Sequence, residues 1–226
     1  MGYVSLYKEA EGYCVTLSAE QGGTLHVMQA DRCFSVVSVF LHEEDKRAGH
    51  ALSSLLRIAY SQAVLYWDAV SIHASAVYCE NKAFLFMGKS GTGKSTHSSL
   101  WMKYIQGTEL LNDDNPTLRI VDGKVYAYGT PWSGKTPCYK SLSYPVGGMV
   151  RLKQAPANRF VRQQEVEAFI ALFPGCCVIH QDAELRACLY DTLIRMVEQV
   201  PVGVLECRPD GEAALLCRNM LLRTDK

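Results

Sequence analysis

A glycine-rich segment near the middle of the chain has the residue types and spacing of a phosphate-binding loop. It reads Gly-Lys-Ser-Gly-Thr-Gly-Lys-Ser over residues 88–95 and follows an apolar run at 83–87. The glycines let backbone amides turn toward a phosphate, and a helix starting at Lys94 adds its positive N-terminal end. Lys94 is expected to contact the β- and γ-phosphates, and the Ser95 hydroxyl to ligate Mg²⁺. The residues predicted to bind the nucleotide are Lys89, Ser90, Gly91, Thr92, Gly93, Lys94, Ser95 and Thr96.

Two adjacent carboxylates follow at a spacing that returns them to this loop. Asp113 and Asp114 come 19 and 20 residues after Lys94, an interval that one helix and one turn would fill. Neighbouring side chains on an extended segment point to opposite sides, so one could face a metal and the other an acceptor group, as a general base does. A solvated turn is the alternative, because Asn-Asp-Asp-Asn-Pro is also good turn composition.

Two more positions are candidates on their surroundings. His73 lies in the expected strand that precedes the loop's own strand, and a buried, hydrogen-bonded core histidine is the alternative. Lys135 closes a small polar and aromatic loop that begins near Trp132 and could cover a phosphate or a substrate. An ordinary surface loop is the alternative for this segment.

The elements that must position these residues follow from the hydrophobic periodicity. Short strands are expected within residues 3–40, then a long helix at about 47–67. A hairpin with strands at 71–79 and 83–88 leads into the loop, and a helix runs from Lys94 to about Tyr104. Further strands are expected within 109–120, within 121–129, at 146–153 and at 202–207, and helices at 165–173, about 185–200 and 212–222. The sequence therefore predicts one α/β unit with a mixed sheet.

Composition narrows the classes of partner. The chain has 226 residues, no formal net charge, 48% apolar residues and 20% charged residues. Without an overall positive charge, neither nucleic acid nor an anionic membrane is expected as a partner. No apolar run reaches the length of a membrane span, and the first residues do not resemble a signal peptide. Nine cysteines, an odd number with no paired metal-ligand spacing, indicate reduced thiols and a cytoplasmic protein.

Taken in order, these motifs resemble a known family. His-Ala-Ser-Ala-Val at 73–77, the loop at 88–95 and Glu-Leu-Leu-Asn-Asp-Asp at 109–114 are similar to the catalytic core of HPr kinase/phosphorylase. Gly-Thr-Pro-Trp-Ser-Gly-Lys at 129–135 and Val-Leu-Glu-Cys-Arg-Pro-Asp at 204–210 resemble its shorter relatives, the HPr-kinase-related group. The resemblance spans about residues 71–210. It implies the mixed-sheet fold of phosphoenolpyruvate carboxykinase, in a single domain at 1–226 with N-terminal strands and a helix at 1–67 and the kinase core at 68–226.

The resemblance also implies a role for each candidate. Asp113 would act as the base toward the acceptor hydroxyl, and Asp114 would lie near the metal. His73 would support the carboxylate or the transferring group, and Lys94 and Lys135 would offset charge in the transition state. The family usually has Glu after the loop serine, where this chain has Thr96.

The expected function is therefore an ATP- and Mg²⁺-dependent kinase that phosphorylates a hydroxyl, most simply a serine of a peptide or small protein. A nucleotide-binding switch with little catalysis and a small-molecule kinase are the alternatives. The sequence leaves open whether the donor is ATP, another nucleoside triphosphate or pyrophosphate, and whether the chain forms a homo-oligomer.

Overall fold

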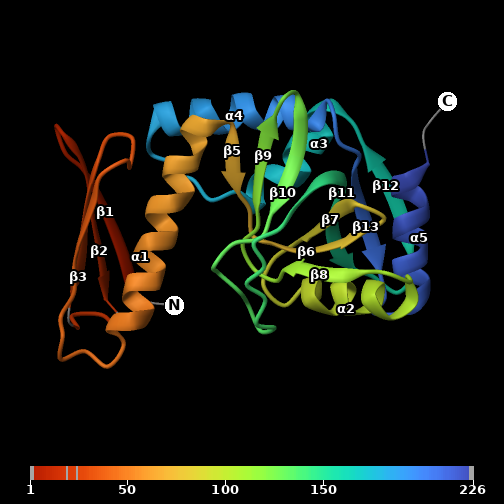
Figure 1. The fold of residues 1–226 in the computed structure, drawn as a ribbon, viewed down its shortest axis with the longest axis horizontal. Helices are drawn as coiled ribbons and strands as arrows, with labels where there is room; N and C mark the ends of the chain where they lie inside the picture. Colours follow the sequence, from red (N-terminus) through yellow and green to blue (C-terminus); the bar gives the residue numbers. More distant parts are fainter. Residues whose placement is uncertain (1–2, 19, 24, 224–226) are drawn as a thin grey trace.

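The described part of the chain combines a four-stranded sheet, a larger mixed sheet and five α-helices (Figure 1). The computed structural model describes residues 3–18, 20–23 and 25–223. Within these ranges, no helix is long and apolar enough to cross a membrane. The expected combination of helices with a mixed sheet is confirmed.

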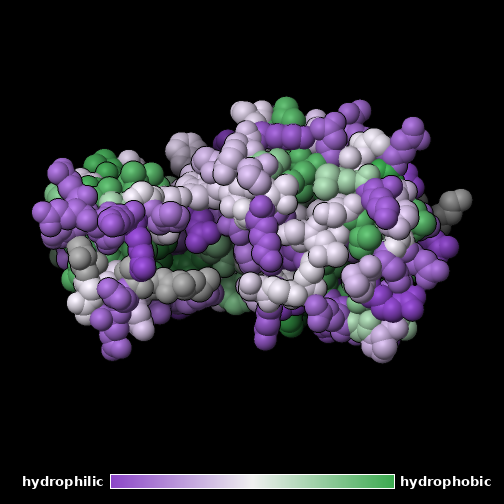
Figure 2. All heavy atoms as spheres, turned by 90° about the horizontal axis from the view of Figure 1, so that it is seen from below, coloured by the Kyte–Doolittle hydropathy of each residue, from purple (hydrophilic) through white to green (hydrophobic). Residues whose placement is uncertain are grey.

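The N-terminal strands form an antiparallel meander that packs against one helix. The strands are β1 (Tyr3–Lys8), β2 (Gly12–Ser18), β3 (His26–Asp31) and β4 (Val37–Phe40), and the helix is α1 (Ala48–Ala63). Val15, Met28 and Leu55 are fully buried in the core that sheet and helix share. Figure 2 shows the surface hollowed between this N-terminal part and the rest of the molecule.

The larger sheet is organised around the long strand β11 (Ser143–Gln154). Its first residues pair with β10, and its later residues pair in parallel with β7 on one side and β13 on the other. The remaining pairs are antiparallel. The other strands are β5 (Ala69–Ser71), β6 (Ala74–Cys79), β7 (Lys82–Met87), β8 (Glu109–Asn112), β9 (Thr117–Val121), β10 (Lys124–Tyr128), β12 (Arg159–Gln163) and β13 (Val202–Cys207).

Helices cover both faces of the sheet around β7 and β11. On one face α2 (Lys94–Tyr104) and α5 (Gly211–Leu222) pack over a core that includes Phe86, Trp101 and Val150. On the other face α3 (Glu165–Leu172) and α4 (Ala183–Val197) belong to the larger core with Leu85 and Met149. The alternation of Met149, Val150, Arg151 and Leu152 along β11 therefore sends successive side chains to opposite helical layers.

Several boundaries differ from the expected ones. The helix expected at 47–67 ends as α1 at Ala63 and continues as the 3₁₀ segment η1 (Val64–Trp67), after which Asp68 has φ +55°. The strand expected at 71–79 is broken around His73. β11 starts three residues before the expected strand, and β12 was not expected at all. All nine cysteines are unpaired, as expected for reduced thiols. The domain division at 67/68 stays a prediction.

A buried carboxylate ties the N-terminal sheet to α4. Asp182 caps that helix by accepting hydrogen bonds from the amides of Glu184 and Leu185, both at 3.0 Å. It also accepts one from the Tyr13 hydroxyl at 2.8 Å and pairs with Lys8 Nζ at 2.5 Å. Burial opposes ionisation of Asp182, but hydrogen bonds from Lys8, the Leu185 amide and Tyr13 hold its pKa well below the usual range.

Candidate functional site

The glycine-rich loop, residues 88–95, joins β7 to α2 as an open cradle. Gly91 and Gly93 have φ +81° and +106°, left-handed values that favour glycine. A Cβ atom at either position would meet nothing within 4 Å, so the space above the loop is free. No side chain caps α2, and the amides of a first helical turn lack intrahelical acceptors. The first turn of α2 therefore has backbone N–H donors of the kind that can bind an anion the size of a phosphate.

Lys94 lies across the cradle and links the loop to His73. Its Nζ donates to the Gly88 carbonyl at 3.0 Å and lies 3.0 Å from His73 Nε2. Burial lowers the pKa of Lys94, and the charges of Asp114 and Asp113 act in the opposite direction. Because an ammonium group can only donate, Nε2 is the acceptor and the proton of the neutral imidazole sits on Nδ1.

That proton points to Asp114, which also pairs with a residue of α1. His73 Nδ1 lies 3.3 Å from Asp114 Oδ1, and Arg57 Nη1 donates to Asp114 Oδ2 at 3.1 Å. The hydrogen bond from His73 lowers the pKa of Asp114 against the effect of burial, and the positive charges of Arg57 and Lys94 lower it further. All of these side chains keep contact with solvent. An ionised carboxylate with an attached imidazole therefore stands beside the cradle, open to a second molecule.

Asp113 has different partners and faces α2. It is buried, and it accepts hydrogen bonds from Ser75 Oγ at 2.9 Å and from the Thr136 amide at 3.2 Å. Ser75 Oγ in turn lies 2.6 Å from Ser98 Oγ, one turn into the helix that Lys94 begins. The two aspartates thus stand on different sides of the segment, one toward α2 and one toward α1.

The turn that carries the aspartates is organised by Asn112. Its Oδ1 accepts from the amides of Asp114 and Asn115, and its Nδ2 donates to the Trp132 carbonyl at 3.0 Å. The turn interpretation of this segment is therefore correct for its backbone, but the Asp113 carboxylate is not solvated.

The loop at 130–137 packs over Asp113 and against α1. Trp132 Nε1 donates to the Ser53 carbonyl at 3.2 Å, and its ring lies 5.0 Å from that of Tyr60. A Cβ on Gly134 would lie 2.5 Å from the Asp113 carbonyl oxygen, so only glycine fits there without a shift. Lys135 is exposed and makes no hydrogen bond or ion pair with the described residues. The structure does not bring it into contact with the other candidates.

Three participants were not identified from the sequence. Arg57 comes from a helix that is far from the motifs in the sequence. Ser75 lies inside the motif at 73–77, but the sequence predicted no role for it. Gln154 donates from the end of β11 to the Gly91 carbonyl at 3.2 Å. The alternation of apolar and polar residues around Ser75 was the one available signal, because it places that hydroxyl on the α2 side of β6.

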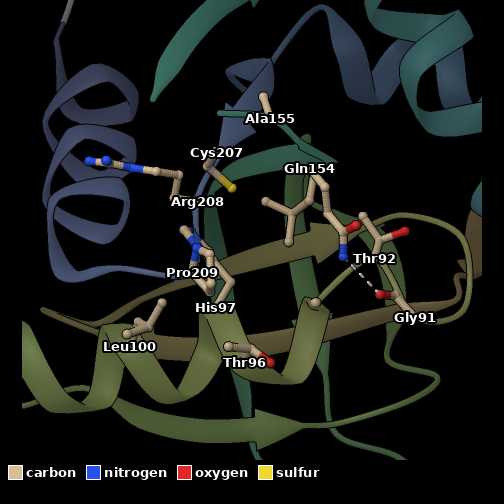
Figure 3. A pocket seen from close by; sticks show the side chains of 12 residues that line it. Gly91, Thr92, Thr96, His97, Leu100, Gln154, Ala155, Cys207, Arg208 and Pro209 are labelled. Carbon is tan, nitrogen blue, oxygen red and sulfur yellow. Dashed lines mark hydrogen bonds between the residues drawn. The ribbon is translucent and has the colours of Figure 1, made fainter. Parts of the chain in front are cut away.

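A pocket of about 440 Å³ opens beside the loop on the side of α2 (Figure 3). It lies where the parallel strands end, since Arg151 pairs with Met87 and Gln154 with Cys207. Ligands of α/β sheets bind at such strand ends. Its walls come from the loop, α2, and the ends of β11 and β13: Gly91, Thr92, Gly93, Thr96, His97, Leu100, Leu152, Gln154, Ala155, Cys207, Arg208 and Pro209.

His97 contributes an uncharged ring to this pocket. Burial lowers its pKa to about 4, so the imidazole is neutral near pH 7. Trp101 Nε1 donates to His97 Nε2 at 3.1 Å, and Nδ1 has no hydrogen-bond partner among the described residues.

The donor set for a metal is small. In the ranges that the structure describes, no three His, Cys, Asp or Glu side chains are grouped so that they could hold an ion by themselves. Mg²⁺ in nucleotide sites is bound by one or two protein oxygens with phosphate oxygens and waters. The Ser95 hydroxyl at the start of α2 and the Asp113 carboxylate, connected through Ser75 to Ser98 of the same helix, are oxygen donors of this kind.

Comparisons with known proteins find a likeness among solved structures but none among sequence families or curated proteins. No protein-family model matches the sequence, and no curated protein matches it. Among solved structures, the chain is similar to the HPr(Ser) kinase/phosphatase from Coxiella burnetii, with a TM-score of 0.41 and 13% sequence identity. The match covers 67% of this chain and 96% of that one.

Proposed function

We propose that this protein is a kinase that transfers the γ-phosphoryl group of ATP to a hydroxyl, most simply a serine of a peptide or small protein. One observation carries the proposal: Lys94 joins the open cradle directly to the His73–Asp114 pair. A phosphate group and an acceptor hydroxyl can thereby be held next to each other. The phosphoenolpyruvate carboxykinase-like fold that the motifs resemble belongs to the same proposal.

The loop would hold the phosphates, and pairing with them would draw Lys94 away from the Gly88 carbonyl. Mg²⁺ at Ser95 would offset charge on the β- and γ-oxygens. The pocket beside α2 would take the nucleoside, because it opens directly from Gly91 and Gly93 and combines the apolar walls of Leu100 and Leu152 with polar groups.

In the transfer step, the acceptor oxygen forms a bond to the γ-phosphorus while the bond to the β–γ bridging oxygen breaks. The products are ADP and a phosphate ester, and the hydroxyl proton passes to a carboxylate of the enzyme. We assign that carboxylate to Asp114. It is partly exposed and paired with His73, whereas Asp113 is buried and connected through Ser75 to Ser98 of α2, the helix that carries the expected metal ligand Ser95. This reverses the roles that the family resemblance implies for the two aspartates.

Radiolabelled transfer to serine peptides tests both the activity and the assignment. We expect Asp114→Asn to retain ATP binding and to reduce transfer by about 10²- to 10⁴-fold, as loss of a general base does. Asp113→Asn should weaken Mg²⁺-dependent ATP binding instead. Asp122→Asn, in the exposed turn between β9 and β10, is the matched control and should behave as wild type.

Three outcomes would count against the proposal or its parts. If Asp113→Asn reduced transfer and Asp114→Asn weakened Mg²⁺-dependent ATP binding, the general base would be Asp113. Rapid phosphate release that no peptide changes, with no labelled peptide, would replace the kinase by a nucleotide-driven switch. Transfer unaffected by either substitution would remove both carboxylates from the chemistry.

A further inference from the structure

A second hollow of about 470 Å³ adjoins the glycine-rich loop along the end of β11. It lies between residues 88–92 and residues 151–154. Its charged lining residues are Lys89, Arg151 and Lys153, and no carboxylate lines it. Three positive charges therefore face one space in a chain whose formal net charge is zero.

These charges are not neutralised within the described part of the chain. Neither Lys89 nor Lys153 makes an ion pair or hydrogen bond there, and both are exposed. Lys140, by contrast, pairs with Glu109 at 2.8 Å. Like charges without a counterion repel one another, so this hollow favours the entry of an anion.

Arg151 and Lys153 extend from β11 on the face opposite α2, since alternate residues of a strand point to opposite sides. Arg151 Nη1 donates to the Ala171 carbonyl of α3 at 3.0 Å. The His73 amide donates at 2.7 Å to the carbonyl of Gly175, which ends the 3₁₀ segment η2 (Phe173–Gly175) directly after α3. One continuous segment, 165–175, thus accepts hydrogen bonds from Arg151 of the hollow and from the His73 amide. The proposed nucleoside pocket shares Gly91, Thr92, Leu152 and Gln154 with this hollow and extends from them toward α2.

We infer that the hollow binds acidic side chains next to the acceptor serine, so that the substrate is an acidic peptide segment. The inference rests on the proposed function, because it names the acceptor of that same site. Carboxylates held at Lys153 and Arg151 would place the neighbouring hydroxyl at Asp114. The alternative role of these cations is to bind the phosphates of the donor nucleotide. The test below distinguishes the two roles.

The test compares three serine peptides that differ only in the flanking residues: aspartate and glutamate, alanine, or lysine. With wild type we expect kcat/KM for the acidic peptide to exceed that for the alanine peptide by about five- to tenfold at low salt. Lys153→Glu should remove or invert that preference while the KM for ATP stays within about twofold. Lys124→Glu, an exposed charge reversal at the start of β10, is the control and should keep the preference.

A binding measurement separates this inference from the proposed function. The ligand is the acidic peptide with alanine in place of serine, and its binding is measured by fluorescence anisotropy. One outcome is tight binding of this peptide that weakens in the Lys153→Glu variant and at high salt, without phosphoryl transfer to the serine peptide. That outcome supports the acidic site and rejects the proposed kinase activity. Transfer with equal kcat/KM for all three peptides rejects the acidic site and supports the kinase. A Lys153→Glu variant whose ATP KM rises while its peptide preference persists assigns the cations to the donor and overturns the inference.

Discussion

Replacing Lys94 by alanine tests the proposed phosphate cradle through thermal stability. In the free protein, the ammonium donates to the Gly88 carbonyl and to His73, both at 3.0 Å. Its lowered pKa shows that burial of this charge has a cost. Loss of two hydrogen bonds and relief of that burial partly cancel, so we expect the unliganded variant to unfold within about 1 kcal/mol of wild type.

The liganded proteins should differ much more. Mg·ATP at a hundred times its Kd stabilises a protein by about 2.7 kcal/mol, which for this length raises the Tm by about 5–11 °C. A charged contact to phosphate contributes about 1.5–3 kcal/mol, so its loss weakens binding about 10- to 150-fold. At the same ATP concentration the variant then gains only about 0.3–1.3 kcal/mol, or about 1–5 °C.

A melting titration with Mg·ATP measures both gains directly. Lys124→Ala, an exposed residue at the start of β10 and outside the loop, is the control and should show the full wild-type shift. The reasoning is refuted if Lys94→Ala and wild type are stabilised equally by ATP. An unliganded variant that is several kcal/mol less stable would show instead that Lys94 is chiefly a structural residue.

Two further predictions concern the elements that hold the site. The pKa of Asp182 is lower in the folded protein than in the unfolded chain. Its contribution to folding stability is therefore complete at a pH above the unfolded-state pKa, and it is lost as the pH falls toward the folded-state pKa. Asp182→Asn should therefore lower the free energy of unfolding by about 1–3 kcal/mol between pH 5 and 7. Urea unfolding should show this difference from wild type shrinking below about pH 4. A difference that is constant with pH would contradict the assignment. Gly134→Ala must displace either its own loop or the Asp113 backbone. We therefore expect the free energy of unfolding to fall by about 1–3 kcal/mol, and Mg²⁺-dependent ATP binding, measured by calorimetry, to weaken. A variant equal to wild type in both measurements would show that the loop moves without loss of stability or binding.

The sequence was sufficient where function requires a local pattern. The spacing of glycines with Lys94 predicted a loop between a buried strand and a helix, and both are present. The interval to Asp113 predicted the return of the aspartates, because a helix and a turn have nearly fixed lengths.

Contacts between distant segments could not be predicted in the same way. Arg57 and Asp114 are 57 residues apart, and nothing in the pattern of α1 distinguishes this arginine from a solvated one. β12 was missed because Arg-Phe-Val-Arg-Gln is short and mostly polar; it becomes a strand through pairing with β13 at the edge of the sheet, where charged residues are common. The different surroundings of the two aspartates also arise from tertiary contacts, with Ser75 on one side and α1 on the other.

Helix α1 touches the site at two points that lie one turn apart on the same face. Arg57 holds the Asp114 carboxylate, and the Ser53 carbonyl holds the Trp132 ring. Two such attachments fix the rotation of the helix about its own axis as well as its distance from the site. Tyr60 Oη, on the next turn of the helix, also lies 2.8 Å from Thr117 Oγ1 of β9, so a pivot about the line through these two contacts is opposed as well. Any larger displacement of the helix must carry the carboxylate and the 130–137 loop with it as one rigid body, or break both contacts together.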